Sequence, residues 1–156
     1  MKNQNSSKAT NTIAGINDLE TLLRIEEEMA RYPLYHTFTK GEFRKYLSES
    51  KSTTFLLYLD NKIAGYCSFK RKNKDLAEIE GMAILEKFRH KGLGTYAMTI
   101  MLEKLKDCKE IMLVTHPENN NSLRLYLKFG FVIKEWKDNY FGKEPRLALW
   151  KIKRSK

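Results

Sequence analysis

Cysteine is scarce in this chain, which has only Cys67 and Cys108 among its 156 residues. Two cysteines cannot build the disulfide framework of a small secreted domain, and no metal-ligand spacing links them. We therefore expect two free thiols, no metal site and a cytoplasmic location.

Long apolar runs are lacking as well. No segment approaches membrane-spanning length, and the polar stretch Met1–Thr12 has no signal-peptide core, so no membrane association is expected. We interpret residues 1–12 as a flexible lead and residues 13–156 as one domain. With 42% hydrophobic residues and eight phenylalanines, a chain of this length can bury a full core.

Acidic residues are in the minority: 19 Asp and Glu stand against 29 Lys and Arg, a net charge of +10. Such a chain attracts anions, which include nucleic acid, acidic proteins and phosphorylated cofactors. No basic-aromatic motif of a nucleic-acid reader occurs, so nucleic acid is not the expected partner. Long-range repulsion also disfavours polycationic substrates.

Hydrophobic periodicity predicts one mixed α/β layer structure without repeats or a domain boundary. Two helices are expected first: one ends at Pro33, and the next starts near Thr39. The remaining elements are strands at Thr53–Leu59, Ile63–Lys70 and Leu76–Leu85, a helix at Gly92–Asp107, a strand at Ile111–Thr115, a helix from about Asn121 to Phe129, and strands at Phe131–Trp136 and Leu147–Ile152.

The segment Arg89-His90-Lys91-Gly92-Leu93-Gly94 lies between a predicted strand and a predicted helix. Glycines at the start of a helix let bare main-chain N–H groups approach a phosphate closely, and the helix dipole adds partial positive charge. Basic side chains in the segment strengthen that field. The sequence therefore predicts a phosphate-bearing ligand here.

The loop has three alternative interpretations. Gly92 to Ala97 also fits the dinucleotide fingerprint, but the next strand ends at Val114-Thr115 without the carboxylate that would hold a ribose. A Walker-type loop is excluded because the chain has no Gly-Lys-Ser/Thr triplet. A purely structural turn remains an alternative for the glycine pair taken alone.

Three segments, in order, resemble the GNAT acetyltransferase superfamily over roughly half the chain. Ala77–Ile84 resembles its central strand, and Arg89–Gly94 fits its pyrophosphate loop, Arg/Gln-x-x-Gly-x-Gly/Ala. Asn119 with Tyr126-Leu127-Lys128-Phe129-Gly130-Phe131 fits its motif Asn-x6-Tyr-x-Lys-x-Gly-Phe. The resemblance implies a GNAT fold of class α/β (α+β), with a mixed, mostly antiparallel sheet of six to seven strands and about four helices. It implies acetyl-CoA or coenzyme A as the cofactor.

The resemblance also implies roles for individual residues. Tyr126 corresponds to the family's thiol-protonating tyrosine, although packing in the core is the alternative. Asn119 would touch the pantetheine arm, although it or Asn121 could instead cap a helix. The expected cofactor contacts are Met82, Ala83, Ile84, Arg89, His90, Lys91, Gly92, Leu93, Gly94, Thr95, Asn119 and Ser122. The main-chain N–H groups of Met82, Ala83 and Ile84 would stabilise the oxyanion that forms during the attack.

A primary amine must lose a proton before it attacks a thioester, so a base or a water chain is needed. Glu78 and Glu80 are the candidates, because residues two apart on a strand share one face. Glu78 aligns with the catalytic glutamate of the histone-acetylating members of the family. A solvated strand face is the alternative for both. Glu26-Glu27-Glu28, His36 and His116 are expected to face solvent, and the acidic run could instead attract a cationic amine.

The predicted function is an acetyl-CoA-dependent N-acetyltransferase that acts by direct attack in a ternary complex. A catalytically silent coenzyme A-binding module is the alternative, with a basic nucleic-acid binder behind it. The acceptor is expected to be an amine on a small molecule or a peptide, shaped by Met29–Lys40 and Trp136–Arg146. A homodimer is possible, and the sequence does not identify the amine.

Overall fold

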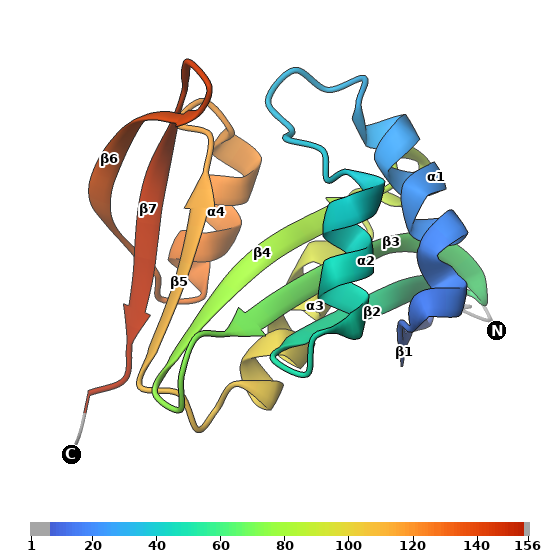
Figure 1. Ribbon diagram of the computed structural model, residues 1–156, viewed down its shortest axis with the longest axis horizontal. Coiled ribbons are helices and arrows are strands. Elements are labelled where there is room, and N and C mark those ends of the chain that lie inside the picture. Colours follow the sequence, from blue (N-terminus) through green and yellow to red (C-terminus); the bar gives the residue numbers. More distant parts are fainter. Residues whose placement is uncertain (1–6, 155–156) are drawn as a thin grey trace, which may run out of the picture.

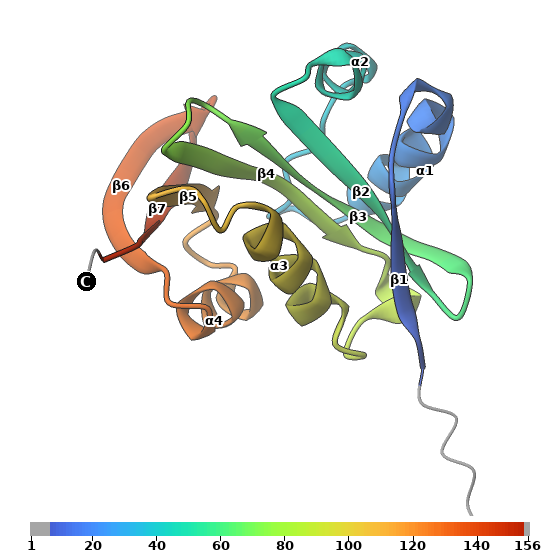
Figure 2. The ribbon, with the colours of Figure 1, turned by 90° about the horizontal axis from the view of Figure 1, so that it is seen from below.

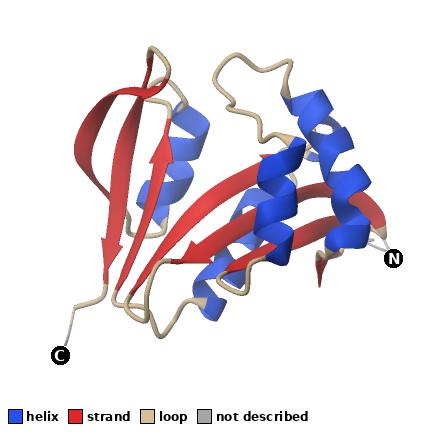
Figure 3. Ribbon diagram, viewed as in Figure 1, coloured by secondary structure: helices blue, strands red, loops and turns tan. Residues whose placement is uncertain are grey.

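The computed structural model describes residues 7–154, and they form a seven-stranded sheet flanked by four helices (Figures 1 and 3). The strand order is β1-β2-β3-β4-β5-β7-β6. Neighbours are antiparallel except β4 and β5, which run parallel. The expected GNAT-like sheet and helix numbers are confirmed.

The elements follow the predicted order, with one strand added at the start. Their bounds are β1 Ala9–Ile13, α1 Leu19–Met29, α2 Lys40–Ser48, β2 Ser52–Leu59, β3 Lys62–Arg71, β4 Leu76–Ile84, α3 Leu93–Lys104, β5 Glu110–Thr115, α4 Asn120–Lys128, β6 Val132–Phe141 and β7 Glu144–Ile152, with short 3-10 turns at Ile16–Asp18 and Glu86–Phe88. No helix in the described part of the chain is long and apolar enough to cross a membrane.

Helices cover both faces of the sheet, α1 and α2 on one and α3 and α4 on the other (Figure 2). Apolar side chains spaced three or four residues apart give each helix its buried stripe. On α1 these are Leu19, Leu22, Ile25 and Met29, which join one core with Phe43 and Tyr66. The larger core lies under α3 and α4, around Met98, Met101, Leu105, Phe55 and Leu113. Both cysteines are free, as expected, and both are buried.

The N-terminal segment differs from the expected flexible lead. Ala9–Ile13 pairs antiparallel with β2 as an edge strand, and the Lys8 N–H and carbonyl both bond to Asp60. Main-chain pairing carries this strand, because none of its side chains is buried and three of the five are polar. The remainder of the expected lead, residues 1–6, lies outside the described residues.

The C-terminal hairpin is longer than the sequence predicts. β6 runs on to Phe141 and β7 starts at Glu144, so the strands enclose a tight turn at Gly142, whose φ is +62°. Most of β6 is exposed, which explains why its polar second half carries no hydrophobic period. This extension brings the hairpin tip up beside the loop that joins α1 to α2.

Candidate functional site

β4 and β5 pair only over the first four residues of each strand, and the site lies where they part. Their parallel pairing ends at Ile79 and Leu113, although β4 continues to Ile84 and β5 to Thr115. A bulge helps this divergence: Ser68 pairs with Gly81 and Phe69 with Ile79, so Glu80 has no partner on β3. Because bulges increase local twist, the far end of β4 turns away and leaves one edge open.

The main chain of β4 alternates between β3 and this open edge. The Leu85 N–H donates to the Ala64 carbonyl, so the main-chain groups of Ala83, two residues earlier, also face β3. Those of Met82 and Ile84 face the open edge. The structure thus presents two of the three expected main-chain contacts, and it turns Ala83 away from the site.

The loop from β4 to α3 presents a row of unpaired amides. His90 and Gly92 have φ values of +60° and +82°, and Gly92 is the N-cap of α3. The Arg89 N–H donates to the Glu86 carbonyl, whereas within residues 7–154 nothing accepts from the N–H groups of residues 90–95. Amides at a helix start, with the positive end of its dipole, form an anion site.

The Arg89 side chain is turned away from these amides. Its Nε donates to the Ile84 carbonyl at 3.0 Å, and its guanidinium lies 4.3 Å from the Tyr32 ring centroid. Arg89 thus braces the end of α1 and the following loop against β4. Lys91 is exposed and does not line the adjoining cavity, whereas Arg89 does.

A cavity of about 610 Å³ runs from the start of α3 along the open edge of β4 to Tyr126 on α4. It gathers ten of the expected cofactor contacts: Met82, Ile84, Arg89, His90, Gly92, Leu93, Gly94, Thr95, Asn119 and Ser122. A channel with amides at one end and an open strand edge along its side fits the diphosphate and the pantetheine arm of coenzyme A.

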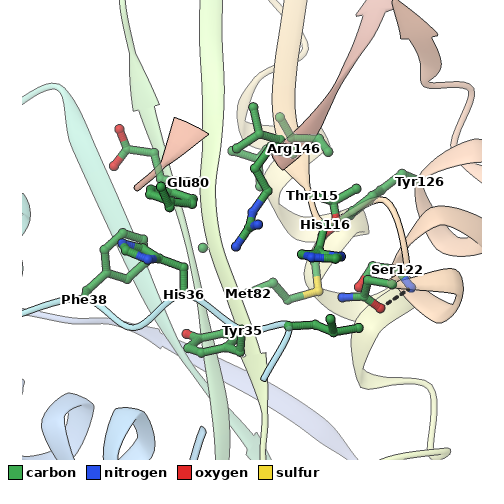
Figure 4. A pocket seen from close by; sticks show the side chains of 17 residues that line it. Tyr35, His36, Phe38, Glu80, Met82, Thr115, His116, Ser122, Tyr126 and Arg146 are labelled. Atoms are coloured by element: carbon green, nitrogen blue, oxygen red, sulfur yellow. Dashed lines mark hydrogen bonds between the residues drawn. The ribbon is translucent and has the colours of Figure 1, made fainter. Parts of the chain in front are cut away.

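A smaller cavity of about 110 Å³ adjoins the larger one at its Tyr126 end (Figure 4). Its walls come from five parts of the fold: the α1–α2 loop, β4, the end of β5, the start of α4 and the β6–β7 hairpin. The lining includes Tyr35, His36, Phe38, Glu80, Met82, Thr115, His116, Tyr126, Phe141 and Arg146. The two cavities share Leu34, Tyr35, Met82, Asn119, Ser122 and Tyr126.

Tyr126 lies where the cavities meet and is only 9% exposed. Burial raises the pKa of Tyr126 to about 12, and the Ser122 side chain acts in the opposite direction. The phenol therefore stays protonated at neutral pH and can donate a hydrogen bond. Asn119 Oδ1 accepts from the Ser122 N–H at 3.3 Å, so Asn119, and not Asn121, caps α4.

The structure separates the two glutamates of β4. Glu78 pairs with Lys72 at 3.1 Å and does not line the smaller cavity. Glu80 does line it, without an ion pair in the described part of the chain. Burial, and then the charge of Glu78, raises the pKa of Glu80, which suits a base working near neutral pH.

Two residues expected in solvent are buried instead. Glu26 is 4% exposed, and its carboxylate accepts hydrogen bonds from the hydroxyls of Tyr35 and Tyr66 and from the Phe38 N–H. His116 is 7% exposed; its Nδ1 accepts from the Glu118 N–H, and its Nε2 lies 3.2 Å from Glu144 Oε2. His36 is exposed as expected and stacks on Phe141.

Arg146 is a further residue of the site that the sequence did not predict. The segment Trp136–Arg146 was expected to shape the acceptor site, but no motif singled out one residue in it. Arg146 is 5% exposed and lines the smaller cavity. An arginine at an inward-facing position of a strand could have signalled this, had the strand been predicted to start before Leu147.

Comparisons with known proteins bear on the family and the fold. Streptothricin acetyltransferase A of Bacillus subtilis is 31% identical over 91 residues, 56% of this chain and 52% of that protein, so the chain spans about half the length of this curated relative. Ard1 from Thermoplasma volcanium has a similar structure, with a TM-score of 0.78 and 22% identity over 94% of this chain and 99% of that one.

A GNAT family acetyltransferase from Elizabethkingia anophelis, solved with acetyl-CoA bound, gives a TM-score of 0.70 and 21% identity over 96% of this chain and all of that one. These structural likenesses show the fold. Residues 18–131 match the sequence profile of the acetyltransferase (GNAT) family. Since this match spans well over half of its length, the chain belongs to the acetyltransferase (GNAT) family.

Proposed function

We propose that the protein is an N-acetyltransferase that transfers an acetyl group from acetyl-CoA to a primary amine by direct attack in a ternary complex. Acetyl-CoA is the family's cofactor, and its thioester supplies an activated acetyl group. Two free thiols support a cytoplasmic location for this activity.

The row of unpaired amides at residues 90–95 carries the proposal. A diphosphate is an anion with several acceptor oxygens, and this row offers N–H donors at the positive end of α3. The larger cavity leads from that row to Tyr126, where the smaller cavity opens. The residues present therefore fit a cofactor on one side of Tyr126 and an acceptor on the other.

Glu80 is the proposed base on the acceptor side. An aliphatic amine with a pKa near ~10 is almost wholly protonated at neutral pH and attacks only after losing a proton. Glu80 lines the acceptor cavity with a raised pKa, so its carboxylate can take that proton directly or through a water. Glu78, paired with Lys72, tunes Glu80 through its charge.

Met82 and Tyr126 are proposed to stabilise the two negative charges that the reaction would generate, on the oxyanion and on the leaving thiolate. The Met82 N–H faces the open edge of β4, where it can donate to a developing oxyanion; such a donor contributes roughly 3 kcal/mol. Tyr126, which lines both cavities and keeps its proton at neutral pH, would act as general acid for the leaving thiolate. A contribution of about a hundredfold in rate is typical for such a group.

Titration calorimetry with acetyl-CoA tests the proposal, using Gly92→Glu and Gly92→Ala as a matched pair. Both changes place a side chain at a φ of +82°, where nothing else lies within 4 Å, so they share the backbone strain. Only the glutamate adds negative charge beside the amides. We expect binding by the native protein, weaker binding by Gly92→Ala and none by Gly92→Glu.

The same titration separates the proposal from its competitors. A native protein that does not bind acetyl-CoA would reject the proposal. A protein that binds the cofactor but releases no thiol with a broad panel of amines would be a silent coenzyme A-binding module. Thiol release is followed with a chromogenic thiol reagent, and the fold of each variant is checked by thermal unfolding.

A further inference from the structure

Arg146 on β7 is a buried cation without an anionic partner in the described residues. Its side chain is 5% exposed, and no carboxylate of residues 7–154 lies within 4.0 Å of it. One hydrogen bond is present, from Nη1 to the carbonyl of the neighbouring Pro145 at 2.7 Å. Figure 4 shows the guanidinium directed into the smaller cavity.

The surroundings of Arg146 hold it in place without neutralising it. Its guanidinium lies 4.8 Å from the ring centroid of Phe141, and Phe141 stacks on His36 with ring centroids 3.6 Å apart. This stack joins the hairpin tip to the α1–α2 loop beside the cavity. Glu144 attracts Arg146 from a distance, but its carboxylate contacts His116 at 3.2 Å.

Several donors of the guanidinium therefore remain for a ligand. Nε and Nη2 donate to no atom of the described chain, and both remain accessible to solvent. A buried charge normally has a counter-ion, because desolvation is costly. A guanidinium presents a fork of N–H groups that matches a carboxylate.

Glu80 lines the same cavity from β4, and Figure 4 shows its carboxylate on the side away from the Arg146 guanidinium. The lining thus includes one cation on β7 and one anion on β4, and the cavity volume is only about 110 Å³. A small molecule that carries both an ammonium and a carboxylate complements this pair of charges. The phosphates of coenzyme A do not account for Arg146, because it does not line the larger cavity with residues 90–95.

We propose that the acceptor is a small amino acid: Arg146 binds its carboxylate, and the amine lies on the Glu80 side of the cavity. This inference rests on the proposed acetyl transfer and adds a substrate class to it. It also predicts that Arg146 determines specificity without taking part in the chemistry.

The test compares each standard α-amino acid with its own carboxamide as acceptor, because the pair differs in the carboxylate charge. The native protein should prefer the best acid over its amide by about 10- to 100-fold in kcat/KM, the range for a hydrogen bond to a charged group. In Arg146→Gln this ratio should fall to about one. Arg146→Lys, which keeps the charge but not the fork, should restore part of it.

Three results would overturn the inference and leave the proposed acetyl transfer standing. They are an equal or better rate with the amide, an unchanged ratio in a folded Arg146→Gln, and preference for an aminoalkylphosphonate over the matching acid. Thermal unfolding of both variants shows whether they are folded. If Arg146→Gln does not fold, the native ratio and that of Arg146→Lys decide.

Equilibrium binding keeps the inference testable if no amine is acetylated. Calorimetry with coenzyme A present measures binding of the same acids and amides. Binding that needs the carboxylate and is lost in Arg146→Gln supports the anion site even though acetyl transfer has failed. If the native protein binds neither acids nor amides, or binds both equally, the inference is rejected.

Discussion

Burial gives each ionisable residue around the site its particular role. Glu80, Tyr126 and Arg146 line cavities and have shifted pKa values, those of Glu80 and Tyr126 raised by burial and that of Arg146 lowered by it. Glu78 lies two residues from Glu80, yet an ion pair with Lys72 occupies it. Residue-scale variants can therefore separate chemistry from surface charge.

Glu80→Gln should reduce turnover by roughly 10²–10⁴-fold, because it removes the proposed base. Glu78→Gln is the matched control and should keep most of the activity. In the native protein only ionised Glu80 can act, so the rate falls as the pH drops through its raised pKa. Since the charge of Glu78 raises that pKa, Glu78→Gln should move the acidic limb of kcat/KM to lower pH. Equal losses in the two variants would contradict the assignment.

Tyr126→Phe should bind acetyl-CoA with native affinity and turn over about a hundredfold more slowly, because it lacks only the hydroxyl. Tyr58→Phe is the control, since its hydroxyl contacts Thr12 on the far edge of the sheet. Calorimetry and steady-state kinetics together decide. Native turnover in Tyr126→Phe would remove this tyrosine from the acid role.

Glu26 stabilises the α1–α2 loop, which forms one wall of the smaller cavity. Its carboxylate accepts from Tyr35, Tyr66 and the Phe38 N–H, and two of these residues belong to that loop. Glu26→Gln cannot accept all three hydrogen bonds, so the free energy of unfolding should fall by roughly 1–3 kcal/mol. Chemical denaturation measures this change.

The pH dependence of that loss has a definite sign. Burial raises the pKa of Glu26 despite its hydrogen bonds, so the folded protein holds this proton to higher pH than the unfolded chain does. The resulting stabilisation is complete below the unfolded pKa and fades as the pH rises through the folded one. The stability gap between native protein and Glu26→Gln should shrink over that interval; a widening gap would show that the pKa is lowered instead.

At the scale of elements, the start of α4 contributes both to the stability of the helix and to the wall of the larger cavity. Asn119 caps the helix through the Ser122 N–H and also lines both cavities. Asn119→Ala should lower the free energy of unfolding by about 1 kcal/mol, whereas Asn119→Asp keeps the cap and should not. Weaker acetyl-CoA binding by Asn119→Asp, with stability retained, would show that the amide contacts the cofactor. Equal stability of both variants would contradict the cap.

The sequence predicted those elements that bury a regular apolar face. The β2–β3 hairpin, β4, α3 and β5 lie close to their expected bounds, because their side chains fill the two cores. The edge strand β1 and the second half of β6 were missed, since most of their side chains are exposed and form no regular apolar face. Hydrophobic periodicity carries no signal for such strands.

The candidate site divides in the same way. The loop at residues 89–94 and the motif around Tyr126 are contiguous in sequence and could be recognised from it. Glu26, His116 and Arg146 owe their burial to neighbours distant in the chain, such as Tyr66 for Glu26 and Glu144 for His116. Tertiary contacts of this kind have no local pattern.

At the scale of the whole molecule, one divergence in the sheet organises the site. β4 and β5 pair over their first four residues and then part, so the sheet holds the larger and the smaller cavity against each other. Figure 1 shows β5, β7, β6 and α4 to one side of this division and β1 to β4 with α1 to α3 to the other. Tyr126 and Met82 lie where the two cavities join.

A crystal structure with acetyl-CoA tests the central claim most directly. We predict the diphosphate within hydrogen-bonding distance of the main-chain N–H groups of residues 90–95, and the acetyl group beside Met82 and Tyr126. Crystals grown in excess acetyl-CoA that show the cofactor elsewhere, or those amides bonded to protein atoms instead, would contradict it.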